Sequence, residues 1–121
     1  MPNAWFVSMG ILMDYLSESQ GVWRCVAGAV QRSYVIESFD QQARQLSLAI
    51  YNSPQIDPQK LVEVVQLTID DDRSQGIGGQ GTTQTGQVIK IRAFQQTVDF
   101  VVDDPVSGSA VGVCTYLSDW Q

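Results

Sequence analysis

Two groups of aspartates are the residues whose chemistry is easiest to name. Asp70 and Asp72 belong to a run of three aspartates that follows an apolar segment, and Asp103 and Asp104 precede a proline-containing turn. Hard cations such as Mg²⁺ and Ca²⁺ bind where several carboxylate oxygens meet. The four side chains are therefore candidate metal ligands if the chain folds the two groups close together.

The first group resembles a calcium loop only in part. Asp70, Asp72 and Ser74 occupy the first, third and fifth positions of an EF-hand loop. Gln75 stands at the sixth position, where glycine must turn the chain, and Gly81 at the twelfth, where a glutamate is required, so an EF-hand is excluded. Aspartates also start turns by bonding the backbone that follows them. Turn formation is the simpler interpretation, and we expect no bound cofactor.

A glycine-rich segment follows the first aspartates. The spacing Gly76-x-Gly78-x-x-Gly81 matches the dinucleotide-binding fingerprint, but that site needs a helix directly after the glycines, and the residues that follow are poor helix formers. We instead predict an extended Gly/Gln-rich arm over residues 70–87, because nothing in it can build a core. Within the arm, the residues expected to contact other subunits are Gln75, Gly76, Ile77, Gly78, Gly79, Gln80 and Gly81.

Catalytic groups are few. The chain contains no histidine, which removes histidine-assisted nucleophiles and histidine-ligated metals. Asp14 and Asp99 lie in apolar runs, where burial would raise the pKa of a carboxyl and make it a general acid. An exposed face of a strand is the simpler interpretation of both, and we expect no enzymatic activity.

Charge and composition exclude further classes of function. The 121 residues carry a net charge of −6, and the seven cationic side chains are scattered singly along the chain. Binding to nucleic acid needs clustered Lys and Arg, so we expect none. The apolar run at residues 4–16 is too short to span a membrane, and no basic residue precedes it as in a signal peptide. We expect a soluble, cytoplasmic protein.

Cys25 and Cys114 each lie in an apolar run that contains β-branched residues. The default interpretation of such a thiol is a small buried hydrophobic side chain. A disulfide between them is an open alternative that the sequence alone does not support.

The elements that would position these residues are organised around one predicted helix, residues 38–52. Ser38 and Gln41 fit a capping box, and Asn52 begins the stop signal. Phe39, Ala43, Leu46 and Ile50 recur at intervals of four, three and four, which is typical of the buried stripe of a helix.

The rest of the chain reads as strands with one further short helix. Asp57 and Pro58 make a good helix start, so a short helix is expected near residues 58–66, passing into a strand that ends at Ile69. Residues 4–16 fit a strand or a helix. Two long hairpins, the second turning at residues 103–108, would form an antiparallel sheet. The predicted fold is α+β, with the helix at 38–52 packed across one face of the sheet.

These expectations lead to two hypotheses about function for a single domain spanning residues 1–121. The first is a non-enzymatic structural or interaction subunit that forms a homo-oligomer or docks into a larger assembly, such as a phage particle. It is motivated by low charge and by fifteen glutamines, a surface that repels its neighbours weakly. The alternative is a small domain that binds a small molecule between helix and sheet, in a pocket lined by Trp23, Tyr34 and Phe94, with carboxylate catalysis by Asp14 or Asp99 as its extension.

Overall fold

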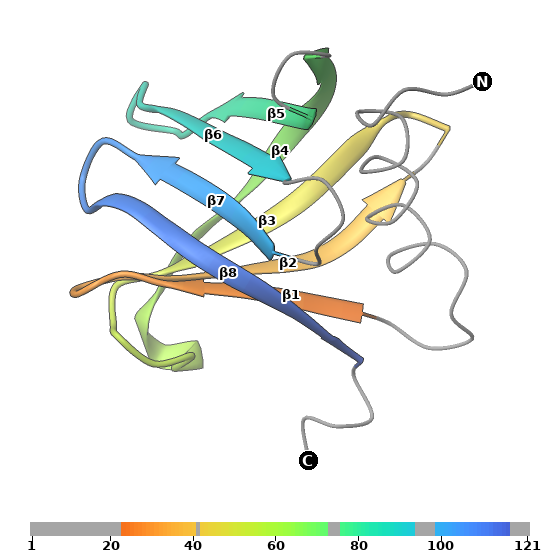
Figure 1. Cartoon of the computed structure of the whole chain (residues 1–121). Helices are drawn as coiled ribbons and strands as arrows, with labels where there is room; N and C mark the ends of the chain where they lie inside the picture. The colour runs from red at the N-terminus through yellow and green to blue at the C-terminus, as the bar shows by residue number, and fades with distance from the viewer. Residues whose placement is uncertain (1–22, 41, 73–75, 94–98, 117–121) are drawn as a thin grey trace.

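In the described part of the chain, eight antiparallel strands, each paired with its neighbours in the sequence, close into a barrel when β8 pairs with β1 (Figure 1). The structure is a computed structural model, and it describes residues 23–40, 42–72, 76–93 and 99–116. The elements in chain order are β1 (Trp23–Gly28), β2 (Ser33–Asp40), β3 (Gln45–Tyr51), the 3₁₀ turn η1 (Pro58–Lys60), β4 (Leu61–Asp72), β5 (Gly76–Thr82), β6 (Val88–Ala93), β7 (Asp99–Asp104) and β8 (Gly108–Tyr116).

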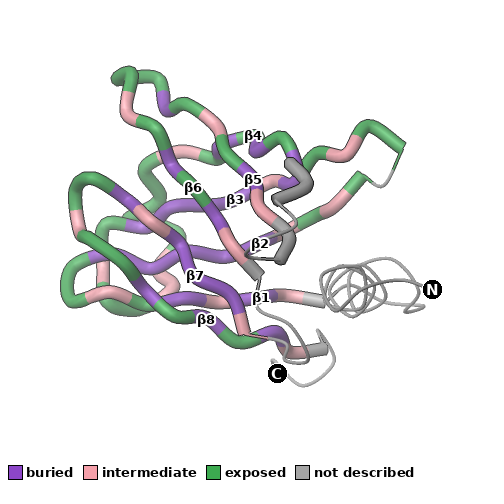
Figure 2. Tube along the Cα trace, turned by 45° about the horizontal axis from the view of Figure 1, so that its top comes forward, coloured by how far each residue is buried: buried purple, intermediate pink, exposed green. Residues whose placement is uncertain are grey.

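The barrel interior is filled by apolar side chains that alternate along the strands with outward-facing residues (Figure 2). This alternation is the period of a strand with one buried face. The buried residues that form this core are Cys25, Ala27, Tyr34, Ile36, Leu46, Leu48, Ile50, Val65, Leu67, Ile69, Ile89, Ile91, Phe100, Val102, Ala110 and Cys114.

The α+β prediction is wrong, because the segment expected to be the central helix at 38–52 forms the end of β2, a turn and β3. Leu46 and Ile50 are buried as predicted, but Leu48 between them is buried too, and Ala43 is exposed. A spacing of four is even, so it satisfies the period of a strand as well as that of a helix. The turn is made by Asp40, whose carboxylate accepts a bond from the backbone N–H of Ala43 at 3.0 Å, and by Arg44, whose φ is 55°.

The second predicted helix, near residues 58–66, is limited to the single turn η1. Its start was predicted correctly, since the Asp57 side chain accepts a bond from Gln59 N at 3.0 Å and Pro58 is the first residue of the turn. Leu61 already has an extended backbone and begins β4, so the β-branched residues that follow adopt the strand they favour.

Residues 76–82, expected within the arm, instead form β5 between β4 and β6. A Cβ at Gly79 would lie 3.0 Å from the Ile91 side chain, and one at Gly81 would overlap the carbonyl of Gln66. The glycines therefore let core side chains and a neighbouring strand approach the backbone closely. The strands expected on either side of the turn at 103–108 are present as β7 and β8.

The two cysteines form a disulfide across the seam of the barrel. Cys25 on β1 lies directly opposite Cys114 on β8, and the two residues are separated by 89 positions in the sequence. The other pairs among the described strands join consecutive strands, so this bond fixes the contact that closes the barrel. The disulfide, which the sequence left as an open alternative, is present in the structure.

Candidate functional site

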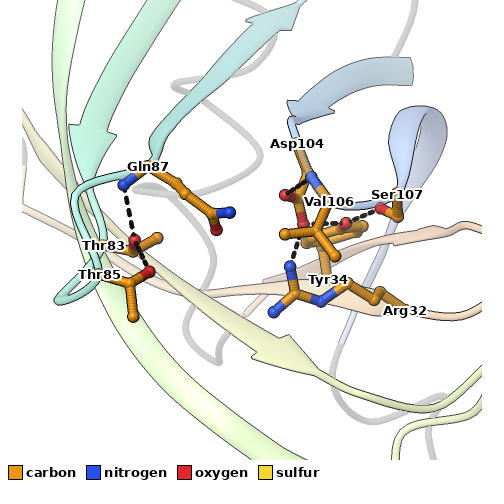
Figure 3. Close-up of polar contacts among 8 residues, drawn as sticks. All are labelled: Arg32, Tyr34, Thr83, Thr85, Gln87, Asp104, Val106 and Ser107. Atoms are coloured by element: carbon orange, nitrogen blue, oxygen red, sulfur yellow. Dashed lines mark hydrogen bonds and ion pairs between the residues drawn. The ribbon is translucent and has the colours of Figure 1, made fainter.

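A buried polar cluster lies at the end of the barrel where β1 turns into β2 and β7 turns into β8 (Figure 3). Arg32 donates from Nη1 to Oδ2 of Asp104 at 2.7 Å, and the Tyr34 hydroxyl donates to the same oxygen. Oδ1 of Asp104 accepts from the backbone N–H of Val106 at 2.9 Å, and the Tyr34 hydroxyl also contacts that of Ser107. The cluster ties together two hairpins that are far apart in the sequence.

The charged groups of this cluster are buried and paired. Asp104 is 2% exposed and Arg32 is 7% exposed, so each ion is stabilised chiefly by the other and by the bonds around it. Burial first, and then the hydrogen bond to Asp104, raises the pKa of the Tyr34 hydroxyl well above its ordinary value. Tyr34 therefore stays protonated as a hydrogen-bond donor. Arg32 Nε is buried without a partner among the described residues.

Two hollows flank the turn that joins β7 to β8. One is an open groove of about 290 Å³ between β6 and the β7–β8 hairpin, lined by Val88, Lys90, Asp103, Asp104, Pro105, Gly108 and Ser109. The other, of about 210 Å³, is lined by Val30, Gln31, Val106 and Ser107. Both lie at the surface, whereas the barrel interior is occupied by the core side chains.

The outer wall of the barrel carries an apolar row that crosses five strands in register. It runs from Val113 on β8 through Val26, Val35 and Ala49 to Val64 on β4. Val35 and Ala49 at its centre are fully buried, in a cluster with Tyr51 against which Val26 and Ile56 pack. At its two ends the row is open to solvent.

Two exposed stripes mark these ends. We call Val111 and Val113, which are 64% and 52% exposed, the β8 stripe. Leu61, Val62 and Val64, which are 46%, 47% and 42% exposed, form the β4 stripe. Four strand positions separate β4 from β8 in either direction around the described eight-stranded barrel, so the two strands lie on opposite sides of it (Figures 1 and 2).

The predicted metal ligands are not brought together. Asp103 pairs with Lys90, Lys90 with Gln80, and Gln80 with Thr68, so Asp103 lies three strands away from β4, where Asp70 and Asp72 are found. Three strand spacings are about 14 Å along a sheet, too far for a shared cation. Within the described residues, no group of three or more potential ligands could hold a metal.

The aspartates near the β7–β8 turn have other roles. Asp104 points inward to Arg32, whereas the Asp103 carboxylate lies on the outer wall, where Oδ1 accepts from the Ser109 hydroxyl at 2.5 Å and Oδ2 lies 3.3 Å from Arg92. Asp104 also bonds the following backbone at Val106, as the turn interpretation expects.

The helix–sheet pocket of the alternative hypothesis has no counterpart, because the described residues contain no α-helix. Tyr34 is in the core and its hydroxyl is bonded to Asp104. Asp99 lies half-buried at the start of β7. The side chains of Trp23 and Phe94, and all of Asp14, lie outside what the structure describes.

The predicted interface residues Gly76–Gly81 lie in a paired strand rather than in a free arm, and Gln75 lies outside the described residues. A contact with other subunits through the outer face of β5 stays a prediction. The exposed stripes were missed, although the alternation of valine with glycine and cysteine at 111–114 was visible in the sequence. The ion pair between Arg32 and Asp104 joins residues 72 positions apart and has no local signal.

In the part of the chain that the structure describes, no helix has the length and apolarity that a membrane crossing requires. Comparison of the chain with family models, with curated proteins and with solved structures finds no match. Function is therefore inferred from the geometry of the chain itself.

Proposed function

We propose that the protein is a non-catalytic structural subunit that associates with further copies of itself through the outer wall of its barrel. The observation that carries this proposal is the pair of exposed valine-rich stripes on β4 and β8. Contiguous apolar surface that stays exposed on a folded domain is typical of protein–protein contacts. A barrel interior filled with side chains leaves the outer wall as the surface available for recognition.

The placement of the stripes favours head-to-tail association. A two-fold dimer uses one patch twice, whereas two patches on opposite walls fit a contact in which the β4 stripe of one copy meets the β8 stripe of the next. Such a contact repeats from copy to copy and builds a ring or a filament. This arrangement suits a component of a larger particle.

Charges around the stripes are compatible with this contact. Lys60, which is exposed, directly precedes the β4 stripe, and Asp99 lies opposite Val113 beside the β8 stripe. Glu63, which lies between Val62 and Val64 in the sequence, accepts a hydrogen bond from the backbone N–H of Gln84 at 3.1 Å. The cores of protein interfaces are depleted of charged residues, and the stripes themselves carry none.

Sedimentation velocity across a range of concentrations tests the proposal. The sedimentation coefficient of the natural protein should rise with concentration, and Val113→Glu should abolish this rise because it places a charge in the β8 stripe. Val30→Glu is the matched control, since Val30 is 90% exposed in the β1–β2 turn and belongs to neither stripe. A protein that sediments as a monomer at every concentration would count against self-association.

The compartment follows from a separate observation. Disulfides persist in oxidising surroundings and are rare in the reducing cytosol. Because Cys25 and Cys114 are bonded, we infer that the protein reaches its final form outside a reducing compartment, or inside an assembly that reductants do not enter. This departs from the expected cytoplasmic location. Blocking free thiols at cell lysis tests it, because labelling of both cysteines would show that the natural form is reduced.

A further inference from the structure

The groove beside the β7–β8 turn is built from residues that suit a ligand with both an apolar and an anionic part. Val88 and Pro105 line it, and Val88 is 42% exposed. Gly108 has a φ of +86°, and a Cβ at this position would meet nothing within 4 Å. The turn therefore requires a residue that tolerates this backbone conformation, and the glycine leaves the space above it open.

The carboxylates of the groove are already engaged. One oxygen of Asp103 accepts from the Ser109 hydroxyl and the other lies beside Arg92. Asp104 is buried, and its two oxygens are bonded by Arg32, Tyr34 and the backbone of Val106. Each aspartate thus has a cationic partner that neutralises its charge.

Lys90 is the remaining charge of the groove. It lies on the outer face of β6 with its side chain exposed, and its backbone is in register with Asp103. Among the described residues it has no carboxylate within the distance of an ion pair, because Asp103 is paired with Arg92 instead. The charges of Asp103 and Asp104 are balanced by Arg92 and Arg32, so the ammonium group of Lys90 gives the groove a net positive charge.

We propose that this groove binds a small organic carboxylate whose apolar body lies against Val88 and Pro105 and whose carboxylate pairs with Lys90. The groove, at about 290 Å³, lies at the lower limit of ligand sites, which fits a molecule of one ring or a short chain. An exposed ion pair contributes little, so the binding is weak. The site is independent of the stripes that carry self-association.

Saturation-transfer-difference NMR with benzoate tests this site at near-physiological ionic strength, where long-range repulsion by the net negative protein is screened. The method observes the ligand, so it works on monomer and oligomer alike. Benzoate should give a saturable signal. Lys90→Gln should weaken its affinity by about fivefold, the loss expected for one exposed ion pair. Val88→Trp, which fills the groove, should reduce the signal as well.

Two controls make the result specific. The chain contains a second lysine, Lys60, so Lys60→Gln is the matched variant and should bind benzoate like the natural protein. Benzamide has the shape of benzoate without its charge, so it lacks the ion pair and should bind about fivefold more weakly. The proposal is overturned if benzoate does not saturate, if benzamide binds equally well, or if Lys90→Gln leaves the affinity unchanged.

Discussion

At the scale of single residues, the close contact between Phe100 and Gly112 constrains the barrel. A Cβ at Gly112 would overlap the Phe100 ring and lie 2.6 Å from the carbonyl of Val26, so the backbone of β8 passes directly under the aromatic side chain. Phe100 is fully buried and cannot move outward without leaving the core. The ring and the glycine are therefore required together.

Gly112→Ala should lower the free energy of unfolding by about 1–3 kcal/mol, the usual cost of adding a methyl group to a filled core. Gly28→Ala is the control, because a Cβ there meets nothing within 4 Å, and it should change stability by less than about 0.5 kcal/mol. Urea denaturation of both variants measures the difference. Equal effects would mean that Phe100 does not lie over Gly112.

Tyr34 should make the protein sensitive to alkali. Its pKa is raised in the folded state, so in the unfolded chain it loses its proton near its ordinary pKa of about 10 while the folded protein still holds it. Deprotonation thus favours the unfolded state, and stability falls as the pH rises above about 10. Tyr51, whose pKa is raised chiefly by burial, acts in the same direction.

The comparison that isolates Tyr34 is Tyr34→Phe, measured by urea denaturation between neutral and strongly alkaline pH. The variant should be less stable at neutral pH, because the buried Asp104 loses a hydrogen-bond donor, but its stability should decline less steeply with pH. If the natural protein and the variant lose stability in parallel, Tyr34 does not keep its proton in the folded state.

At the scale of elements, the sequence predicted strands better than it predicted helices. The start of η1 at Asp57 and Pro58 could be predicted from the sequence, because the interactions that form it involve only the next few residues. The prediction of a helix at 38–52 was wrong because apolar residues spaced by four fit the period of a strand as well as that of a helix. The pairing of β3 with β2 and β4 decides in favour of the strand. The sequence predicts an arm where β5 forms, because a single sequence does not show that Ile91 and Gln66 lie close to the glycines of this strand.

The contact between β1 and β8 is the element pairing that depends most on the disulfide. The bond removes freedom from an unfolded chain in which 89 positions separate the two cysteines. Its reduction should lower the free energy of unfolding by about 2–5 kcal/mol. Urea denaturation with and without reductant measures this loss, and a variant carrying both Cys25→Ala and Cys114→Ala should be insensitive to reductant. An unchanged midpoint for the natural protein in reductant would contradict the assignment.

At the scale of the whole molecule, the barrel presents two different surfaces to its surroundings. The end that carries the β1–β2 and β7–β8 turns holds the ion pair between Arg32 and Asp104 and the groove at Lys90. The wall carries the β4 and β8 stripes. The ion pair and the groove could not be predicted from the sequence, because they join residues that only the closed barrel brings together. Each stripe lies on a single strand, and for β8 the alternation at 111–114 was visible in the sequence. The proposed self-association and the proposed ligand binding should therefore be separable by substitution.

Mixing two blocked variants tests head-to-tail association most directly. Val64→Glu disables the β4 stripe and Val113→Glu disables the β8 stripe, so each variant alone should be a monomer by sedimentation velocity. Each variant keeps the stripe that the other lacks, so an equimolar mixture should form a one-to-one dimer that grows no further. A mixture that stays monomeric, although the natural protein associates and the Val30→Glu control associates like it, would contradict the contact between β4 and β8.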